Sequence, residues 1–221
     1  MKVVITGASS GIGRATAQKF LLEGHQVIGI DVLPDPFDIK CDPASPGVYT
    51  HYIRDVSKDI PDIDDVDILI NNAGVQNSGN DIDINLKGTI NCTEAYAIQP
   101  NIKAVVNVAS VSAHNGAEFP EYCASKGGML SYTKNVAKRI AKFGATCNSI
   151  SPGGVITELN SHVIDDPDKW AAIMDETPLR RWATIYEIAD WIYFIAVCNR
   201  SMTGQDVLID NGEMINHNFI W

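Results

Sequence analysis

The sequence lacks the patterns that mark metal-binding, disulfide-rich and membrane proteins. Its five cysteines include no C-x-x-C pair and its five histidines no H-E-x-x-H, so neither a zinc site nor a disulfide framework is indicated. No apolar run approaches the length of a membrane span. The run after Lys2 is also too short for the apolar core of a secretory signal. We therefore expect a cytoplasmic protein that holds no metal.

Positive charge is also scarce. The chain has 17 basic and 27 acidic residues, and its net charge of −10 argues against nucleic acids and anionic membranes as partners. Its 221 residues and its hydrophobic content of 45% suit a single domain with a well-formed core. No internal repeat or low-complexity linker divides the chain. We expect one domain over residues 1–221 that acts on a small molecule.

The N-terminal residues carry the clearest pattern that is present. Lys2–Thr6 reads KVVIT, which is typical of a buried parallel strand. A glycine-rich turn follows and leads into a helix that should end at Gly24. Helix N-termini have unpaired N–H groups and a partial positive charge, so this turn is suited to a dinucleotide pyrophosphate, although an ordinary strand-to-helix turn remains the alternative. The candidate cofactor residues in it are Gly7, Ser9, Ser10, Gly11, Ile12 and Gly13.

The second strand, Gln26–Ile30, places Asp31 at its tip, about twenty residues past the glycines, where a carboxylate can accept hydrogen bonds from ribose hydroxyls. The alternative is a turn-forming Asp. The prolines between residues 34 and 48 exclude a helix, and Pro61 interrupts the next connection. We therefore expect abbreviated second and third crossovers, with strands at His51–Val56 and Val66–Ile70.

Further motifs follow in a fixed order. They are the tetrapeptide NNAG at Asn71–Gly74, Asn85 in a predicted helix Asp83–Ile98, Ser110 after a predicted strand Lys103–Ala109, and the pair Tyr122 and Lys126, which face one way on a helix. With the glycine turn, this order resembles the short-chain dehydrogenase/reductase family, from Lys2 to Gly212. Two alternatives stay open: Asn85 as a helix cap, and Ser112 in place of Ser110.

The resemblance implies a single Rossmann-type α/β fold, a doubly wound parallel sheet of about seven strands with helices on both faces. It implies hydride transfer between NAD(H) and a carbonyl or secondary alcohol, with Tyr122 as acid and base, Lys126 and Ser110 assisting, and Asn85 in a proton relay. The alternatives are a 3-oxoacyl-thioester (ACP) reductase that uses NADPH and a non-catalytic dinucleotide-sensing regulator. The carboxylate of Asp31 favours NAD(H) over NADP(H), because it would repel a 2′-phosphate.

The family's cofactor contacts also map onto this sequence. Asp55 and Val56 match the pair beside the adenine, although a solvated loop Asp is the competing interpretation. Asn72, Ala73 and Gly74 match the lining of the cofactor cleft, and Tyr122 and Lys126 contact the cofactor as well. A strand at Thr146–Ser151 leads to the segment that holds the nicotinamide, with Pro152, Gly153, Val155 and Thr157.

Residues 155–183 are expected to form a substrate lid. Asp166 and Pro167 begin a short helix whose Trp170 and Met174 share a face, which we expect to close over the substrate unless it is a packed surface helix. A long helix, Lys126–Phe143, a capping box at Thr184 and a last strand, Asp206–Asp210, complete the chain. The resemblance implies a homodimer or homotetramer in which the helices Asp83–Ile98 and Lys126–Phe143 pack on their symmetry mates, and the apolar tail His217–Trp221 needs a cover.

Overall fold

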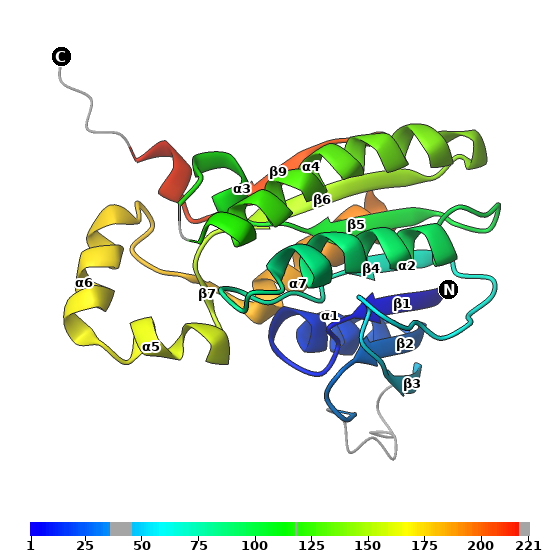
Figure 1. Ribbon diagram of the computed structural model, residues 1–221, viewed down its shortest axis with the longest axis horizontal. Helices are drawn as coiled ribbons and strands as arrows, with labels where there is room; N and C mark the ends of the chain where they lie inside the picture. Colours follow the sequence, from blue (N-terminus) through cyan, green and yellow to red (C-terminus); the bar gives the residue numbers. More distant parts are fainter. Residues whose placement is uncertain (36–45, 118, 217–221) are drawn as a thin grey trace.

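The computed structural model describes residues 1–35, 46–117 and 119–216. Its centre is a parallel seven-stranded sheet in the order β3-β2-β1-β4-β5-β6-β9, which confirms the doubly wound fold (Figure 1). The strands are β1 (Lys2–Thr6), β2 (Gln26–Asp31), β3 (Val48–Ile53), β4 (Ile68–Asn71), β5 (Ala104–Val108), β6 (Thr146–Pro152) and β9 (Asp206–Ile209).

The middle of the sheet is buried on both faces. Almost every residue of β1, β4, β5 and β6 is buried. The apolar runs of β1, β4 and β5 predict this, whereas β6 is buried although it reads TCNSISP. Helices α1 (Gly11–Leu22) and α7 (Ile185–Tyr193) pack on one face through Phe20, Ile188 and Ile192. Helices α2 (Gly88–Tyr96) and α4 (Pro120–Ile140) pack on the other through Tyr96 and Val136.

The third crossover is abbreviated, as predicted. Residues 54–67, which connect β3 to β4, contain no helix. In the second crossover, residues 32–35 and 46–47 contain no helix either, while the rest of the proline-rich stretch lies outside the described residues. Strand β3 is partly exposed at the edge of the sheet.

Several predicted boundaries were wrong. Strand β3 begins at Val48, which pairs with Gln26, and not at His51, and the chain leaves the sheet at Arg54. Strand β4 begins at Ile68, two residues later than predicted, and strand β5 is shorter by one residue at each end. Pairing with the neighbouring strands sets these limits, and a pattern of apolar residues does not report it.

Two predicted helices also differ from the structure. Helix α4 begins at Pro120, six residues before the predicted start, because a proline is well tolerated in the first helical turn. It ends in a 3₁₀ turn, η2 (Ala141–Phe143), and Gly144 follows with φ of 72°. The predicted helix Asp83–Ile98 is a π-helical turn, η1 (Ile82–Lys87), followed by α2. The capping box at Thr184 is present, and a second π-helical turn, η4 (Phe194–Cys198), follows α7.

Residues 155–184 form a separate unit beyond the carboxyl ends of the strands. It begins and ends with two paired short strands, β7 (Val155–Ile156) and β8 (Ala183–Thr184). Between them lie η3 (Glu158–Asn160), α5 (Ser161–Ile164) and α6 (Pro167–Glu176), which project from the body of the molecule (Figure 1). A short C-terminal turn, η5 (Glu213–Ile215), lies near this unit. Within the described ranges, no helix is long and apolar enough to cross a membrane.

Candidate functional site

One large cleft, of about 1330 Å³, opens where the strands end. The ends of β1, β2, β4, β5 and β6 line it, and the projecting unit forms its far side. Pockets for drug-sized ligands measure about 300–1,000 Å³, so this cleft has room for a dinucleotide with a second molecule beside it. The carboxyl edge of a parallel sheet is where such folds place their ligands.

The N-terminus of α1 points into the cleft with its backbone N–H groups uncapped. The Ser10 side chain makes no capping hydrogen bond, and the first turn holds no acidic residue. Gly7 and Gly11 have φ of 67° and 48°, in the left-handed region that favours glycine, and both line the cleft. A helix end of this kind suits a phosphate group.

Two residues predicted to bind the cofactor do not line the cleft. A Cβ atom on Gly13 would lie 1.9 Å from the Gly7 carbonyl oxygen, so this glycine permits the close packing of α1 on the loop. Ser9 is buried, and its hydroxyl donates to the carbonyl oxygen of Pro34 at 2.9 Å. Both residues therefore support the conformation of the glycine loop without facing the cleft.

Asp31 lies at the tip of β2 and is held rigidly. Its Oδ2 accepts from the Ser9 amide at 2.8 Å and its Oδ1 accepts from the Leu33 amide at 3.0 Å. The residue is 9% exposed and lines the cleft. The neighbouring strand end adds Asp55 and Val56, also in the lining. Hydrogen bonds from Ser57 and the ammonium group of Lys58 lower the pKa of the Asp55 carboxyl.

The NNAG segment joins the end of β4 to the glycine loop. The Asn71 amide donates to Thr93 Oγ1 and Asn107 Oδ1 at 3.0 and 2.8 Å, inside the sheet. The Asn72 amide donates to the carbonyl oxygens of Thr6 and Gly7, both at 3.1 Å. Asn72, Ala73 and Gly74 all line the cleft. Asn72 therefore pairs with the backbone at the end of β1, whereas Asn71 pairs with side chains of α2 and β5.

Asn85 is neither a helix cap nor part of the cleft lining. It is 0% exposed inside the π-helical turn η1, and its side-chain amide pairs in both directions with the Val75 backbone, at 2.8 and 2.9 Å. Its Nδ2 also donates to Ser125 Oγ at 3.0 Å, which ties the NNAG loop to α4. Its place in a proton relay stays a prediction.

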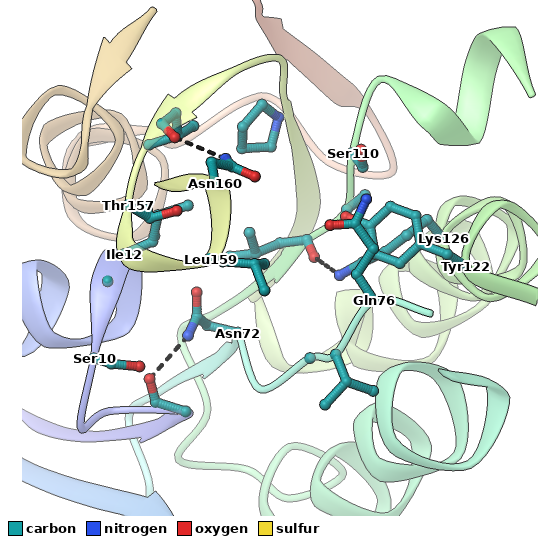
Figure 2. Close-up of a pocket in the computed structure, with 18 of the residues that line it drawn as sticks. Ser10, Ile12, Asn72, Gln76, Ser110, Tyr122, Lys126, Thr157, Leu159 and Asn160 are labelled. Atoms are coloured by element: carbon teal, nitrogen blue, oxygen red, sulfur yellow. Dashed lines mark hydrogen bonds between the residues drawn. The ribbon is translucent and has the colours of Figure 1, made fainter. Parts of the chain in front are cut away.

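Ser110, Tyr122 and Lys126 lie together on one side of the cleft, with Gln76 beside them (Figure 2). Ser10 and Ile12 lie on the opposite side, near Thr157. Ser112 is buried and does not line the cleft, so the geometry favours Ser110 over its rival. The Lys126 ammonium lies 5.7 Å from the centre of the Tyr122 ring, as expected for residues one helical turn apart.

Burial lowers the pKa of Lys126 to about 8, while the carboxylate of Asp81 acts in the opposite direction. Its Nζ donates to the Val108 carbonyl oxygen at 2.8 Å. Asp81 is buried and accepts from the amides of Asn77 and Ser78, both at 2.9 Å. The sequence gives no sign of this buried carboxylate because Asp81 belongs to no recognised motif. The site thus holds a lysine that titrates close to neutral pH.

The segment after β6 closes the cleft. Pro152, Gly153, Val155 and Thr157 line it as predicted. A Cβ atom on Gly11 would lie 3.7 Å from Thr157 Cγ2, so this segment meets the glycine loop. The lining residues that the motifs did not indicate include Arg54, Gln76, Trp182, Glu213 and Asn216. They reach the cleft through loops and terminal turns with no sequence periodicity.

The lid helix turns a different face to the cleft than expected. The lining from α6 is Ala172, Ile173 and Glu176, and it includes neither Trp170 nor Met174. Trp170 packs edge-on against Trp182, with ring centres 5.1 Å apart. Trp182 lines the cleft, so Trp170 supports the lining from behind. Helix α6 has no buried residue, and its rotation is set by contacts that residue spacing does not reveal.

Similarity to known proteins extends over nearly the whole chain. A family model described as Enoyl-(Acyl carrier protein) reductase matches residues 7–213. The chain is 31% identical to the glucose 1-dehydrogenase of Gluconobacter oxydans, over 99% of this chain and 93% of that protein. It is also 31% identical to a 3-oxoacyl-[acyl-carrier-protein] reductase of Thermotoga maritima, over 96% and 97% of the two chains.

Solved structures share the fold over nearly the full length. A proposed 2-deoxy-d-gluconate 3-dehydrogenase from Agrobacterium tumefaciens with bound NADP has a TM-score of 0.85 and 26% identity, covering 97% of this chain and 96% of that one. A 4-hydroxyisoleucine dehydrogenase in complex with NADH has a TM-score of 0.80 and 28% identity, covering 98% and 99%. One of these two structures thus holds NADP and the other holds NADH.

Proposed function

This chain belongs to the short-chain dehydrogenase/reductase family and is a nicotinamide-dependent oxidoreductase, and on that premise we propose which residues perform its hydride transfer. The reaction interconverts an alcohol and a carbonyl compound. When bound, the nicotinamide cofactor accepts a hydride from the alcohol carbon or returns one to the carbonyl carbon. The protein must bind both molecules and move one proton at the substrate oxygen.

The cleft fits the cofactor. The uncapped N-terminus of α1 would hold the pyrophosphate, and Asp31 would accept from the ribose hydroxyls of the adenosine half. Asp55 and Val56 would border the adenine. Val155 and Thr157, which follow β6, would hold the nicotinamide half.

Tyr122 would exchange the proton. In reduction its hydroxyl gives a proton to the carbonyl oxygen, and in oxidation its phenolate takes the proton from the alcohol oxygen. The nearby Lys126 ammonium favours the phenolate electrostatically. Ser110 would hydrogen-bond the substrate oxygen. Asn85 would hold the loop and α4 in place, because its amide joins Val75 to Ser125.

The convergence of Ser110, Tyr122 and Lys126 on one side of the cleft is the observation that carries this proposal. Tyr122→Phe removes the proton and keeps the ring, so turnover should fall at least about a hundredfold. Cofactor affinity, measured by the fluorescence of bound NADH, should change little. Tyr132→Phe is the matched control, because this hydroxyl bonds Glu94 on the outer side of the same helix. Near wild-type turnover in Tyr122→Phe would remove this residue from the mechanism.

We propose NAD(H) as the preferred cofactor. The support is the carboxylate of Asp31, fixed in the cleft by two backbone amides. A 3-oxoacyl-thioester reductase that uses NADPH is the second candidate, because several relatives are named 3-oxoacyl-[acyl-carrier-protein] reductase. The fixed carboxylate weighs against it.

We further propose that the protein is a homodimer or homotetramer. The support is a shallow apolar groove on the outer side of α7 and β9, which includes Leu179, Trp191, Phe194 and Leu208. The apolar tail lies outside the described residues. The cytoplasmic location expected from the sequence stays a prediction.

A further inference from the structure

The far side of the cleft carries three carboxylates, which we call the acidic wall: Glu158, Glu176 and Glu213. They come from three different elements, η3, α6 and η5. The same side carries the amide side chains of Asn160 and Asn216. A substrate beside Ser110 and Tyr122 would therefore face charge and hydrogen-bonding groups together.

Glu213 is placed near Ser110 by a chain of backbone contacts. The amide of Val111, next to Ser110, donates to the Pro152 carbonyl oxygen at 3.0 Å. Two residues later, the amide of Gly154 donates to Glu213 Oε1 at 3.1 Å. A Cβ atom on Gly153 would lie only 2.5 Å from Glu213 Oε2, so the carboxylate lies directly against this turn.

The C-terminal turn also holds the lid. Asn216 Nδ2 donates to the Glu176 carbonyl oxygen at 2.7 Å and to Glu176 Oε2 at 3.2 Å. Glu176 and Glu213 are thus joined through residues 213–216. Two of the three carboxylates of the acidic wall are therefore held together by the C-terminal turn, while Glu158 is an exposed side chain of η3.

Positive charge is nearly missing from the cleft. Among the described residues that line it, the only cations are Arg54 and Lys126. Arg54 follows β3, at the Asp31 end, and its Nε pairs with Asp59 at 3.2 Å. The Lys126 ammonium donates to the Val108 carbonyl oxygen. Both cations of the lining are therefore already engaged, Arg54 by Asp59 and Lys126 by the backbone of β5, and the described lining adds no further arginine or lysine to bind a substrate carboxylate.

We propose that this cleft selects an uncharged, polyhydroxylated carbonyl compound or alcohol and rejects its carboxylate counterpart. The inference rests on the proposed function, because it assumes that the substrate binds beside Ser110 and Tyr122. Carboxylates accept strong hydrogen bonds from hydroxyl groups, and the amides of the wall can donate or accept. An anionic substrate would be repelled by the same carboxylates in a partly enclosed site.

The test compares pairs of sugars in which a neutral hydroxymethyl group is replaced by a carboxylate. Glucose with glucuronate and galactose with galacturonate keep the reacting C1 and differ at C6. We expect kcat/KM at least about tenfold higher for the neutral member of a pair that turns over. Tryptophan fluorescence of the NAD complex gives a readout independent of turnover, since Trp182 lines the cleft. Neutral sugars should change it at lower concentration than their acids.

Two variants connect the preference to the wall. Glu176→Gln and Glu213→Gln should each raise the use or binding of the acid relative to the sugar severalfold. Glu121→Gln is the control, because it removes a carboxylate next to Tyr122 that is exposed and outside the cleft lining. It should leave the ratio unchanged.

The possible failures are distinct. Equal or better use of the acids, or an unchanged ratio in both variants, would overturn this inference. Turnover of simple ketones such as ethyl acetoacetate without binding of any neutral sugar or polyol would also overturn it, and would leave the proposed function intact. Absence of both cofactor binding and turnover on every compound would overturn the proposed function as well.

Discussion

At the residue scale, we expect Asp31 to set the choice of cofactor. Two unit charges about 4 Å apart repel by roughly 4 kcal/mol at an effective dielectric constant near 20, and solvent and salt reduce this to about half. About 1.4 kcal/mol corresponds to tenfold, so we expect NAD(H) to exceed NADP(H) by at least about tenfold in kcat/KM. Steady-state kinetics with both cofactors measures this ratio. Equal rates would mean that a cation offsets the repulsion.

The structure sharpens the choice of variant at this position. Asp31→Ala would leave the amides of Ser9 and Leu33 without their acceptors and would loosen the loop. Asp31→Asn removes the charge and keeps one acceptor oxygen. It should therefore lower the ratio of kcat/KM with NAD(H) to kcat/KM with NADP(H), mainly by raising kcat/KM with NADP(H). Arg54→Ala is the companion variant, because Arg54 is the cation of the lining at this end of the cleft. If Arg54→Ala raised the preference for NAD(H), Arg54 would be a partner of the 2′-phosphate.

Lys126 should leave a signature in the pH dependence of stability. Its pKa is lowered by burial from 10.5 to about 8, so the folded state disfavours the charged lysine. Below pH 8 this cost is present in full, and it disappears as pH rises from about 8 to 10.5. Lys126→Met removes the cost, so its stability relative to the unmutated protein should fall by up to about 3 kcal/mol over that interval.

Urea unfolding at several pH values, without added cofactor, measures this difference. Lys134→Met, an exposed lysine of the same helix, should show no comparable trend. A stability difference for Lys126→Met that stays constant between pH 7 and 10.5 would show that the buried ammonium costs nothing.

At the element scale, helix α6 supplies one side of the cleft. Its Ile173 lines the cleft, whereas Trp170 packs on Trp182 behind the lining. Ile173→Ala should therefore raise KM for the substrate with little change in cofactor affinity. Trp170→Ala is the matched control on the same helix. It should lower the thermal midpoint of unfolding, and it should raise KM less than Ile173→Ala does. An unchanged KM in Ile173→Ala would indicate a packed surface helix with no role as a lid.

At the scale of the whole molecule, the open side of α7 and β9 predicts assembly. Trp191, Phe194 and Leu208 are 44%, 50% and 42% exposed there. By contrast, the outer side of α2 and α4, the expected interface, carries the ion pair of Glu94 with Arg139. Phe194→Glu should reduce the mass measured by light scattering, because it introduces a charge into an apolar contact. Lys138→Glu on α4 is the control, and dissociation by that variant alone would favour the α2 and α4 interface.

Local sequence was sufficient to predict much of the site. Strands such as KVVIT are buried on both faces, so a continuous apolar run marks them, and a glycine turn after one of them marks the N-terminus of α1. The pair Tyr122 and Lys126 needs only the pitch of a helix to face one way. Ser110 and NNAG each follow a parallel strand. Parallel strands all end at the same edge of the sheet, so the order of the motifs predicts that Ser110 and NNAG lie together there.

Only the tertiary structure decided which of these residues reach the cleft and what surrounds them. Ser9, Gly13 and Asn85 belong to the motifs, yet they do not line the cleft. They are packed against, or hydrogen-bonded to, the segments that do line it. The acidic wall joins residues more than fifty positions apart, and Glu213 reaches Gly154 only after the chain has folded. The position of α6 depends in the same way on contacts with distant residues, among them Trp170 with Trp182 and Glu176 with Asn216. Periodicity describes one element at a time, whereas such contacts depend on the distance between elements, and only the folded chain sets that distance.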